Sequence, residues 1–172
     1  MACSLDVVAL AGTPSSVCAA VLRFREGRLT DKREFLFHDT SDIDAVREEF
    51  LPRYYLDDEQ IPKIIAVDAL PPDMDALQQA LNQKRGSEVQ LYVPQRGDKA
   101  HLVEMAHTNA VERLAREENV PLVDVRGAFL DYGHLEQTLC ADGTHPNTVG
   151  QGLITKAFQD FGRGLRLAGQ TV

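Results

Sequence analysis

The sequence has no apolar run long enough to cross a membrane, and its first residues lack the basic start and long apolar segment of a secretory signal peptide. Cysteine is scarce: Cys3, Cys18 and Cys140 are an odd number at scattered positions, with no C-x-x-C pair. This usage argues against a disulfide framework and against a zinc knuckle. We therefore expect a protein of the reducing cytoplasm with no membrane partner.

Basic residues are also in deficit. The 172 residues contain 18 Lys and Arg against 26 Asp and Glu, a formal net charge of −8. An acidic surface repels a phosphate backbone unless a local basic stripe reverses the field, so nucleic-acid binding is not expected of the isolated chain. We interpret the two small basic groups, Lys84 with Arg85 and Arg96 with Lys99, as a solvated rim. The composition does not identify a specific binding partner.

The chain has the length of one domain, so we predict a single domain over residues 1–172. Apolar periodicity predicts elements in the order βββαβαβαβα. The strands lie in 5–12, 16–38 (two strands, with a turn at Glu26 and Gly27), 62–70, 88–95 and 120–125, and the helices in 41–56, 72–86, 99–118 and 147–162.

This order favours an α/β fold in three layers: one mixed sheet, Rossmann-like or RNase H-like, with helices on both faces. The last strand, Val120 to Val125, and the last helix should cover the sheet. The helical residues expected to face inward are Leu102, Met105, Ala106, Ala110 and Leu114 in one helix, and Val149, Leu153, Ala157, Phe158 and Phe161 in the other.

The stretch CADGTHPNTVGQG, residues 140–152, places Asp142 three residues before His145. A carboxylate in this position can accept the imidazole Nδ1 proton, which leaves Nε2 free to take a proton from a nucleophile. Ser15 and Ser16, in the turn after the first strand, are the candidate nucleophiles. The alternative is structural: the Asp and His shape a turn, Asn147 or the next residue caps the last helix, and the serines satisfy loop backbone.

A metal-dependent nuclease would need several carboxylates around a divalent cation, and Asp6, Asp68 and Asp124 lie on or near predicted strands. Their spacing does not show that they converge, and local structural roles are favoured for all three. The five histidines also lack metal-ligand spacing. We therefore expect neither a metal nor a cofactor.

Residues from about 5 to 116 resemble the middle region of the excinuclease UvrC, the nuclease component of nucleotide-excision repair. The resemblance is carried by AAVLRFREGRLTDKREFLF, by RYYLDDEQIPKIIAVDALPPD and above all by VPQRGDKAHLVEMAHTNAVERLAREE, residues 93–118. In that family this stretch precedes or opens the RNase H-like endonuclease part. The family's catalytic D-I-S-H segment and later carboxylates should follow, and they do not appear in this sequence.

Residues from about 109 to 162 are instead similar to the C-terminal end of SGNH (GDSL-type) hydrolases, whose D-x-x-H-P segment supplies two members of a Ser-His-Asp triad. This resemblance maps those two roles onto Asp142 and His145. The family's G-D-S-L block and its G-x-N-D block have no counterpart here, so any triad would be partial.

The two resemblances together predict a recombined or engineered chimera that joins a UvrC-like body to a hydrolase-like end, with no complete active site. Two alternatives stay open. The first is a weak SGNH-type esterase that uses Ser15 or Ser16 with His145 and Asp142. The second is a DNA-repair interaction module of UvrC type.

Overall fold

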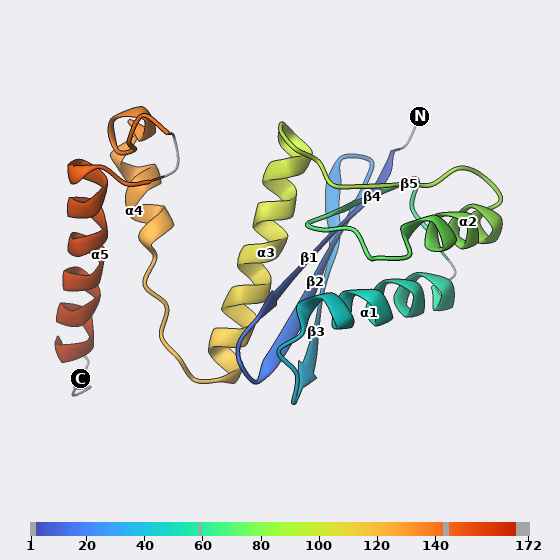
Figure 1. Ribbon diagram of the computed structural model, residues 1–172, viewed down its shortest axis with the longest axis horizontal. Coiled ribbons are helices and arrows are strands. Elements are labelled where there is room, and N and C mark those ends of the chain that lie inside the picture. The colour runs from blue at the N-terminus through green and yellow to red at the C-terminus, as the bar shows by residue number, and fades with distance from the viewer. Residues whose placement is uncertain (1–2, 59, 143–144, 168–172) are drawn as a thin grey trace. The chain divides into compact units, whose positions relative to one another are not determined.

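The computed structural model describes residues 3–58, 60–142 and 145–167 (Figure 1). The chain divides into two compact units, Met1–Val120 (unit 1) and Pro121–Val172 (unit 2), which we describe separately. The expectation of a single domain over the whole chain therefore stays a prediction. Unit 1 contains β1 (Ser4–Gly12), β2 (Ser16–Arg25), β3 (Arg28–His38), α1 (Ile43–Asp57), β4 (Ile64–Val67), α2 (Met74–Arg85), β5 (Gln90–Tyr92) and α3 (Asp98–Glu117).

The five strands of unit 1 form one mixed sheet in the order β3-β2-β1-β4-β5. The first three strands are antiparallel neighbours, and β4 and β5 are added in parallel beside β1. The β2–β3 turn lies where the sequence predicts it, because Glu26 and Gly27 both have positive φ, 53° and 74°. Two such residues in succession match the right-handed twist of a tight hairpin.

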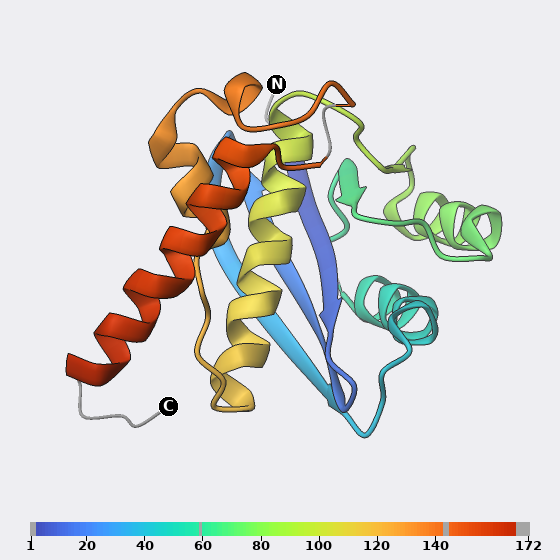
Figure 2. The same cartoon turned by 60° about the vertical axis from the view of Figure 1, so that its left-hand side comes forward.

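Helices cover both faces of this sheet, as Figures 1 and 2 show. Alternate strand residues point to opposite faces. On one face Val8 and Ile65 pack with residues of α1 and α2 such as Phe50 and Leu81. On the other face α3 packs through Ala106, Ala110 and Leu114. The predicted three-layer α/β architecture is confirmed for this unit.

The predicted strand Val120–Val125 is wrong. Residues 120–124 are irregular and the helix α4 (Val125–Tyr132) follows them. The physical reason is local: Asp124 caps this helix, with its Oδ1 accepting the Gly127 backbone N–H at 2.7 Å. Val120 is 53 % exposed and Leu122 is 45 % exposed, so this short apolar run does not complete a sheet.

Unit 2 consists of α4, a short 3-10 helix (Leu135–Gln137) and α5 (Thr148–Leu167). The last helix is confirmed, but part of its predicted inward face is wrong, since Val149 and Phe158 are 43 % and 56 % exposed. The same applies in unit 1 to Met105, which is 45 % exposed on α3. No helix in the described part of the chain is long and apolar enough to span a bilayer.

Candidate functional site

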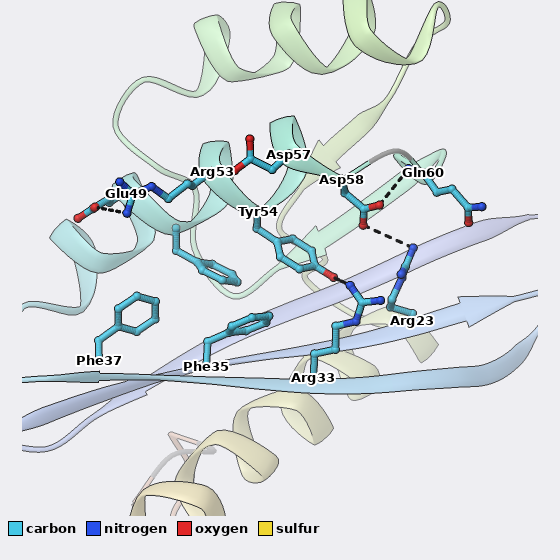
Figure 3. Close-up of a pocket in the computed structure, with 11 residues that line it drawn as sticks. Arg23, Arg33, Phe35, Phe37, Glu49, Arg53, Tyr54, Asp57, Asp58 and Gln60 are labelled. Atoms are coloured by element: carbon cyan, nitrogen blue, oxygen red, sulfur yellow. Dashed lines mark hydrogen bonds and ion pairs between the residues drawn. The ribbon is translucent and has the colours of Figure 1, made fainter.

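A hollow of about 710 Å³ in unit 1 lies between α1 and the strands β2 and β3. Its position follows from two periodicities. Arg33, Phe35 and Phe37 alternate along β3 and so share one face, and Phe50 and Tyr54 are four residues apart on α1 and so share one side of the helix. Figure 3 shows the side chains of β3 and those of α1 facing each other across this pocket.

Four aromatic rings form the apolar floor of the pocket. Phe50 is nearly buried and lies 5.1 Å from Phe35, 6.0 Å from Phe37 and 5.3 Å from Tyr54 between ring centroids. Offset and edge-on pairs at these separations stabilise one another beyond the area they bury. Phe35, Phe37 and Tyr54 keep part of their surface exposed, so the floor remains available to a ligand.

Charged groups form the polar rim. Arg33 Nη1 donates to the Tyr54 hydroxyl at 3.0 Å, and its guanidinium lies 5.9 Å from the centre of the same ring. Burial raises the pKa of Tyr54, and the neighbouring arginine opposes that rise, so the phenol stays protonated at neutral pH. At one end of the pocket Arg23 Nη2 lies 3.7 Å from Asp58 Oδ2, an oxygen that accepts no hydrogen bond from the described residues.

Beneath this rim the buried carboxylate of Asp6 holds three elements together. Its Oδ1 accepts from Arg25 Nη1 at 2.8 Å, its Oδ2 accepts from the Tyr55 hydroxyl at 3.0 Å, and Arg23 Nε lies 3.9 Å away. Burial raises the pKa of Asp6 more than the hydrogen bond and charge of Arg25 lower it. The same burial, together with the Asp6 charge, raises the pKa of Tyr55. This network fixes the strand ends and α1 that shape the pocket.

The three carboxylates considered for a metal site have separate structural roles. Asp6 is fully buried and paired as described above. Asp68 Oδ2 accepts from the Leu10 backbone N–H at 3.0 Å and from Arg47 Nη2 at 3.2 Å. Asp124 belongs to unit 2, where it caps α4. Within the described ranges, no three His, Cys, Asp or Glu side chains are grouped so as to bind a metal ion.

Ser15 and Ser16 both belong to unit 1 and have local bonding roles. Ser15 Oγ donates to Glu118 Oε1 at 3.0 Å. Ser16 is only 5 % exposed, and its backbone N–H donates to Thr13 Oγ1 at 3.1 Å. Neither contact supplies a base that would activate a hydroxyl nucleophile at neutral pH in the manner of an imidazole.

Asp142 and His145 do come together, in unit 2. His145 Nδ1 lies 2.6 Å from Asp142 Oδ2, and the His145 backbone N–H donates to Asp142 Oδ1 at 3.0 Å. Both side chains are exposed, 77 % for the imidazole and 49 % for the carboxyl. Asn147 follows the pair and caps α5, with its Oδ1 accepting from the Val149 and Gly150 backbone. The segment thus shows both the predicted pair and the predicted helix start.

The family to which unit 1 belongs is decided by sequence comparison. The sequence model of the UvrC ribonuclease H-like domain matches residues 4–117, which is more than half of the chain and nearly all of unit 1. The chain belongs to this family. The predicted RNase H-like fold class is thereby confirmed for unit 1, whereas the hydrolase resemblance of the C-terminal part stays a prediction.

Curated relatives agree with the UvrC assignment. The UvrABC system protein C of Finegoldia magna is 31 % identical over 112 residues, which covers 64 % of this chain and 18 % of that protein. The Salinispora arenicola protein of the same name is 36 % identical over 118 residues, 66 % of this chain and 18 % of that protein. This chain therefore spans less than a fifth of the length of these relatives.

A solved structure, the PCNA:RNase HII complex from Archaeoglobus fulgidus, is also similar, with 12 % identity, 66 % of this chain and 77 % of that chain covered, and a TM-score of 0.36.

Our sequence analysis did not predict the aromatic pocket. The alternation of Arg33, Phe35 and Phe37 is the signal that could have found it, once paired with Phe50 and Tyr54 at helical spacing.

Proposed function

We propose that unit 1 is a non-catalytic docking module of a UvrC-type DNA-repair protein. It binds an apolar segment of a partner protein in the pocket between β3 and α1. The observation that carries this proposal is the aromatic floor of that pocket, which is partly exposed and bordered by arginine, glutamine and carboxylate side chains. Binding sites commonly combine an apolar hollow with a few convergent polar groups.

The position of β3 supports a protein partner. In the described sheet β3 pairs only with β2, so its 11 residues form an edge strand directly beside the pocket. An extended segment that adds to such an edge gains backbone hydrogen bonds, and its alternate side chains point into one face. Arg33, Phe35 and Phe37 lie on that face. A partner segment paired with β3 would therefore place alternate side chains over the aromatic floor.

The roles of the carboxylates support docking over nuclease chemistry. A metal-dependent nuclease needs carboxylate oxygens free to bind the cation. Both oxygens of Asp6 are engaged by Arg25 and Tyr55, and one oxygen of Asp68 is engaged by Arg47. Moving the buried Asp6 carboxylate away from Arg25 would break a close ion pair, which is costly.

The relatives are named as protein C of a UvrABC system, so the other proteins of such a system are the partners to test. We would immobilise the full chain and measure binding of each purified UvrABC component by interferometry. The variant Phe37→Ala removes a ring of the floor, and Arg53→Glu reverses a charge at the rim, where the Arg53 side chain is 74 % exposed. We expect each variant to weaken binding about tenfold or more, as is typical of anchor residues.

Met105→Ala is the matched control, because this residue is similarly apolar and lies on α3, away from the pocket. It should bind as the wild type does. Arg53→Glu alters only an exposed side chain, so it keeps the test valid if Phe37→Ala impairs folding. The proposal would be refuted if Arg53→Glu and Phe37→Ala bind the partner as tightly as the wild type does, or if the wild type binds no UvrABC component.

A second candidate rests on the His145 and Asp142 pair. We propose that unit 2 descends from an SGNH-type hydrolase end joined to the UvrC-like body, and that the pair retains weak ester hydrolysis. The 2.6 Å contact supports this, because it orients the imidazole through Nδ1 and leaves Nε2 without a hydrogen bond to the described residues. Unit 2 contains no serine, and the candidate nucleophiles remain Ser15 and Ser16 of unit 1.

Hydrolysis of a p-nitrophenyl ester tests this second candidate. Saturable turnover that is lost in His145→Ala and in the double variant Ser15→Ala/Ser16→Ala would support a partial triad. An exposed imidazole gives a background rate of its own, so His134→Ala is the control for a surface histidine. Equal turnover in all four proteins would show that the DGTHPN segment is only a turn and helix start.

A further inference from the structure

A second hollow of unit 1 has a different chemistry from the aromatic pocket. It has a volume of about 320 Å³ and lies at the start of β1, the end of β2 and the C-terminal end of α2. Its described lining consists of Ser4, Arg25, Gln60, Ile61, Pro62, Lys84 and Arg85. None of these described lining residues is acidic, and three are cationic, although the chain as a whole carries a net charge of −8.

The cations of this pocket are held mostly by neutral acceptors. Lys84 Nζ donates to the Leu56 carbonyl, and Arg85 Nη1 donates to the Glu88 carbonyl at 3.0 Å and to the Ser87 hydroxyl. Carbonyl oxygens orient these groups without neutralising them. Basic residues in the last turn of α2 also complement the helix dipole, but that role does not require a hollow beside them.

Arg25 supplies the strongest indication of a binding site. Its Nη1 donates to Asp6 Oδ1 and to the backbone carbonyls of Leu5 and Phe24. Its Nη2 is shielded from water and has no hydrogen-bond acceptor among the described residues. A donor without an acceptor is unfavourable. Because the Arg25 side chain is 26 % exposed, a shift of its guanidinium would bring Nη2 into contact with an anionic oxygen in the pocket. Ser4 Oγ already accepts the Lys63 backbone N–H at 2.8 Å, which leaves its own proton free to donate.

We propose that this pocket binds a phosphate group, with Arg25, Lys84 and Arg85 as its cationic ligands and Ser4 as a neutral donor. Guanidinium, ammonium and hydroxyl donors around one hollow match the several acceptor oxygens of a phosphate. The phosphate comes from a free phosphorylated small molecule or from the backbone of a nucleic acid strand. This inference does not depend on protein docking at the aromatic pocket.

The test uses the full chain and two probes, pyrophosphate and a labelled single-stranded oligonucleotide. Pyrophosphate is titrated into isotope-labelled protein, and the backbone amides around the pocket, such as those of Ile61 and Gly86, are followed by NMR. The double variant Lys84→Gln/Arg85→Gln should weaken pyrophosphate binding about tenfold or more, because two charge-assisted contacts are lost. Arg96→Gln/Lys99→Gln removes the same charge from residues that do not line this pocket. This control should change pyrophosphate binding by less than about twofold, since charges without a direct contact are screened by salt.

The oligonucleotide distinguishes the two sources of phosphate. If a nucleic acid backbone is the source, fluorescence anisotropy will detect binding of the oligonucleotide to the wild type. In the Lys84/Arg85 variant, the slope of log binding constant against log salt concentration should then be shallower by roughly 0.7 for each lost contact. Pyrophosphate binding alone would assign the pocket to a small phosphorylated ligand. If neither probe separates the Lys84/Arg85 variant from its control, the proposal is overturned. If the double variant folds poorly, the single variant Lys84→Gln is compared in its place. None of these outcomes decides whether a partner protein binds at the aromatic pocket, so the two proposals are tested independently.

Discussion

Cys18 lies on β2 with its side chain fully buried, whereas Cys3 and Cys140 are exposed. Burial, aided by the Glu34 carboxylate, raises the pKa of the Cys18 thiol to about 11. The thiolate is the reactive form, so a buried thiol with a raised pKa reacts slowly.

We predict that a thiol reagent such as Ellman's reagent modifies Cys3 and Cys140 rapidly in the folded protein at mildly alkaline pH, and modifies Cys18 only after unfolding. Absorbance at the end of each phase counts the thiols. The Cys18→Ala variant should lose the slow phase and keep the fast one. Rapid reaction of all three thiols in folded protein would show that the α3 side of the sheet is open to solvent.

The Asp6 network makes a prediction with a defined pH direction. Because burial raises the pKa of Asp6 above 3.8, the folded state holds this proton more tightly than the unfolded state does. The stabilisation that this proton gives the folded state is therefore complete below pH 3.8, and it is lost as the pH rises through the pKa of Asp6 in the folded state. Asp6→Asn stays neutral and does not titrate. We expect the free energy of unfolding of the wild type to fall relative to Asp6→Asn as pH increases across that window.

Urea unfolding at several pH values measures this difference. Glu88→Gln removes one exposed carboxyl and is the control, because it shows how much the free energy of unfolding changes when any one negative charge is lost. A wild-type advantage that grows with pH would contradict the prediction and would mean that Arg25 outweighs burial. Asp6→Ala, by contrast, removes the charged partner of Arg25 and the acceptor of the Tyr55 hydroxyl, and should cost about 3–5 kcal/mol at neutral pH.

At the scale of elements, the β2–β3 hairpin sets the position of the pocket, and its turn can be tested directly. Gly27 has φ of 74°, a conformation that a residue with a Cβ adopts with strain. Gly27→Ala should destabilise unit 1 by about 1 kcal/mol. Gly152→Ala is the matched substitution inside α5, where an added Cβ meets nothing within 4 Å, and it should increase helix stability by about 0.5–1 kcal/mol. Thermal unfolding followed by circular dichroism checks both signs, and a neutral or stabilising Gly27→Ala would argue against the turn geometry.

The elements that the sequence predicted correctly are those with strong local signals. The hairpin has its Glu26–Gly27 turn, and α2 ends at Gly86 in a left-handed conformation. The segment 120–125 failed because a short apolar run does not distinguish a strand from irregular chain, and a strand exists only where a neighbour pairs with it. The N-cap of α4 at Asp124 was the overlooked signal.

The candidate sites also differ in how far the sequence predicts them, because a sequence pattern indicates only contacts between residues that are close along the chain. The Asp142–His145 contact is local, three residues apart, so the sequence predicted it and the structure shows it. The aromatic pocket and the cationic pocket each combine segments that are distant in sequence. Arg25 and Lys84, for example, come together only because β1 pairs with both β2 and β4, and no spacing within one segment reveals that.

At the scale of the whole molecule, unit 1 contains the entire described sheet and the helices that cover it. We therefore predict that a chain ending at Val120 folds cooperatively without unit 2. Amide proton dispersion by NMR and a single unfolding transition in urea would check this. A collapsed, poorly dispersed spectrum would show instead that residues 1–172 behave as one domain, as the sequence length alone suggests. The full chain, compared under the same conditions, is the control.

Docking of a protein partner on the face formed by β3 and α1 should be visible in the backbone amides of this face. We would measure hydrogen–deuterium exchange of the full chain, alone and with a UvrABC component that binds it. We predict that the partner slows exchange in β3, Arg28–His38, where a new strand would engage the free backbone edge, and leaves exchange in α2 and α5 unchanged. Protection confined to any other element, with β3 exchanging as in the free protein, would show that the partner does not dock on this face.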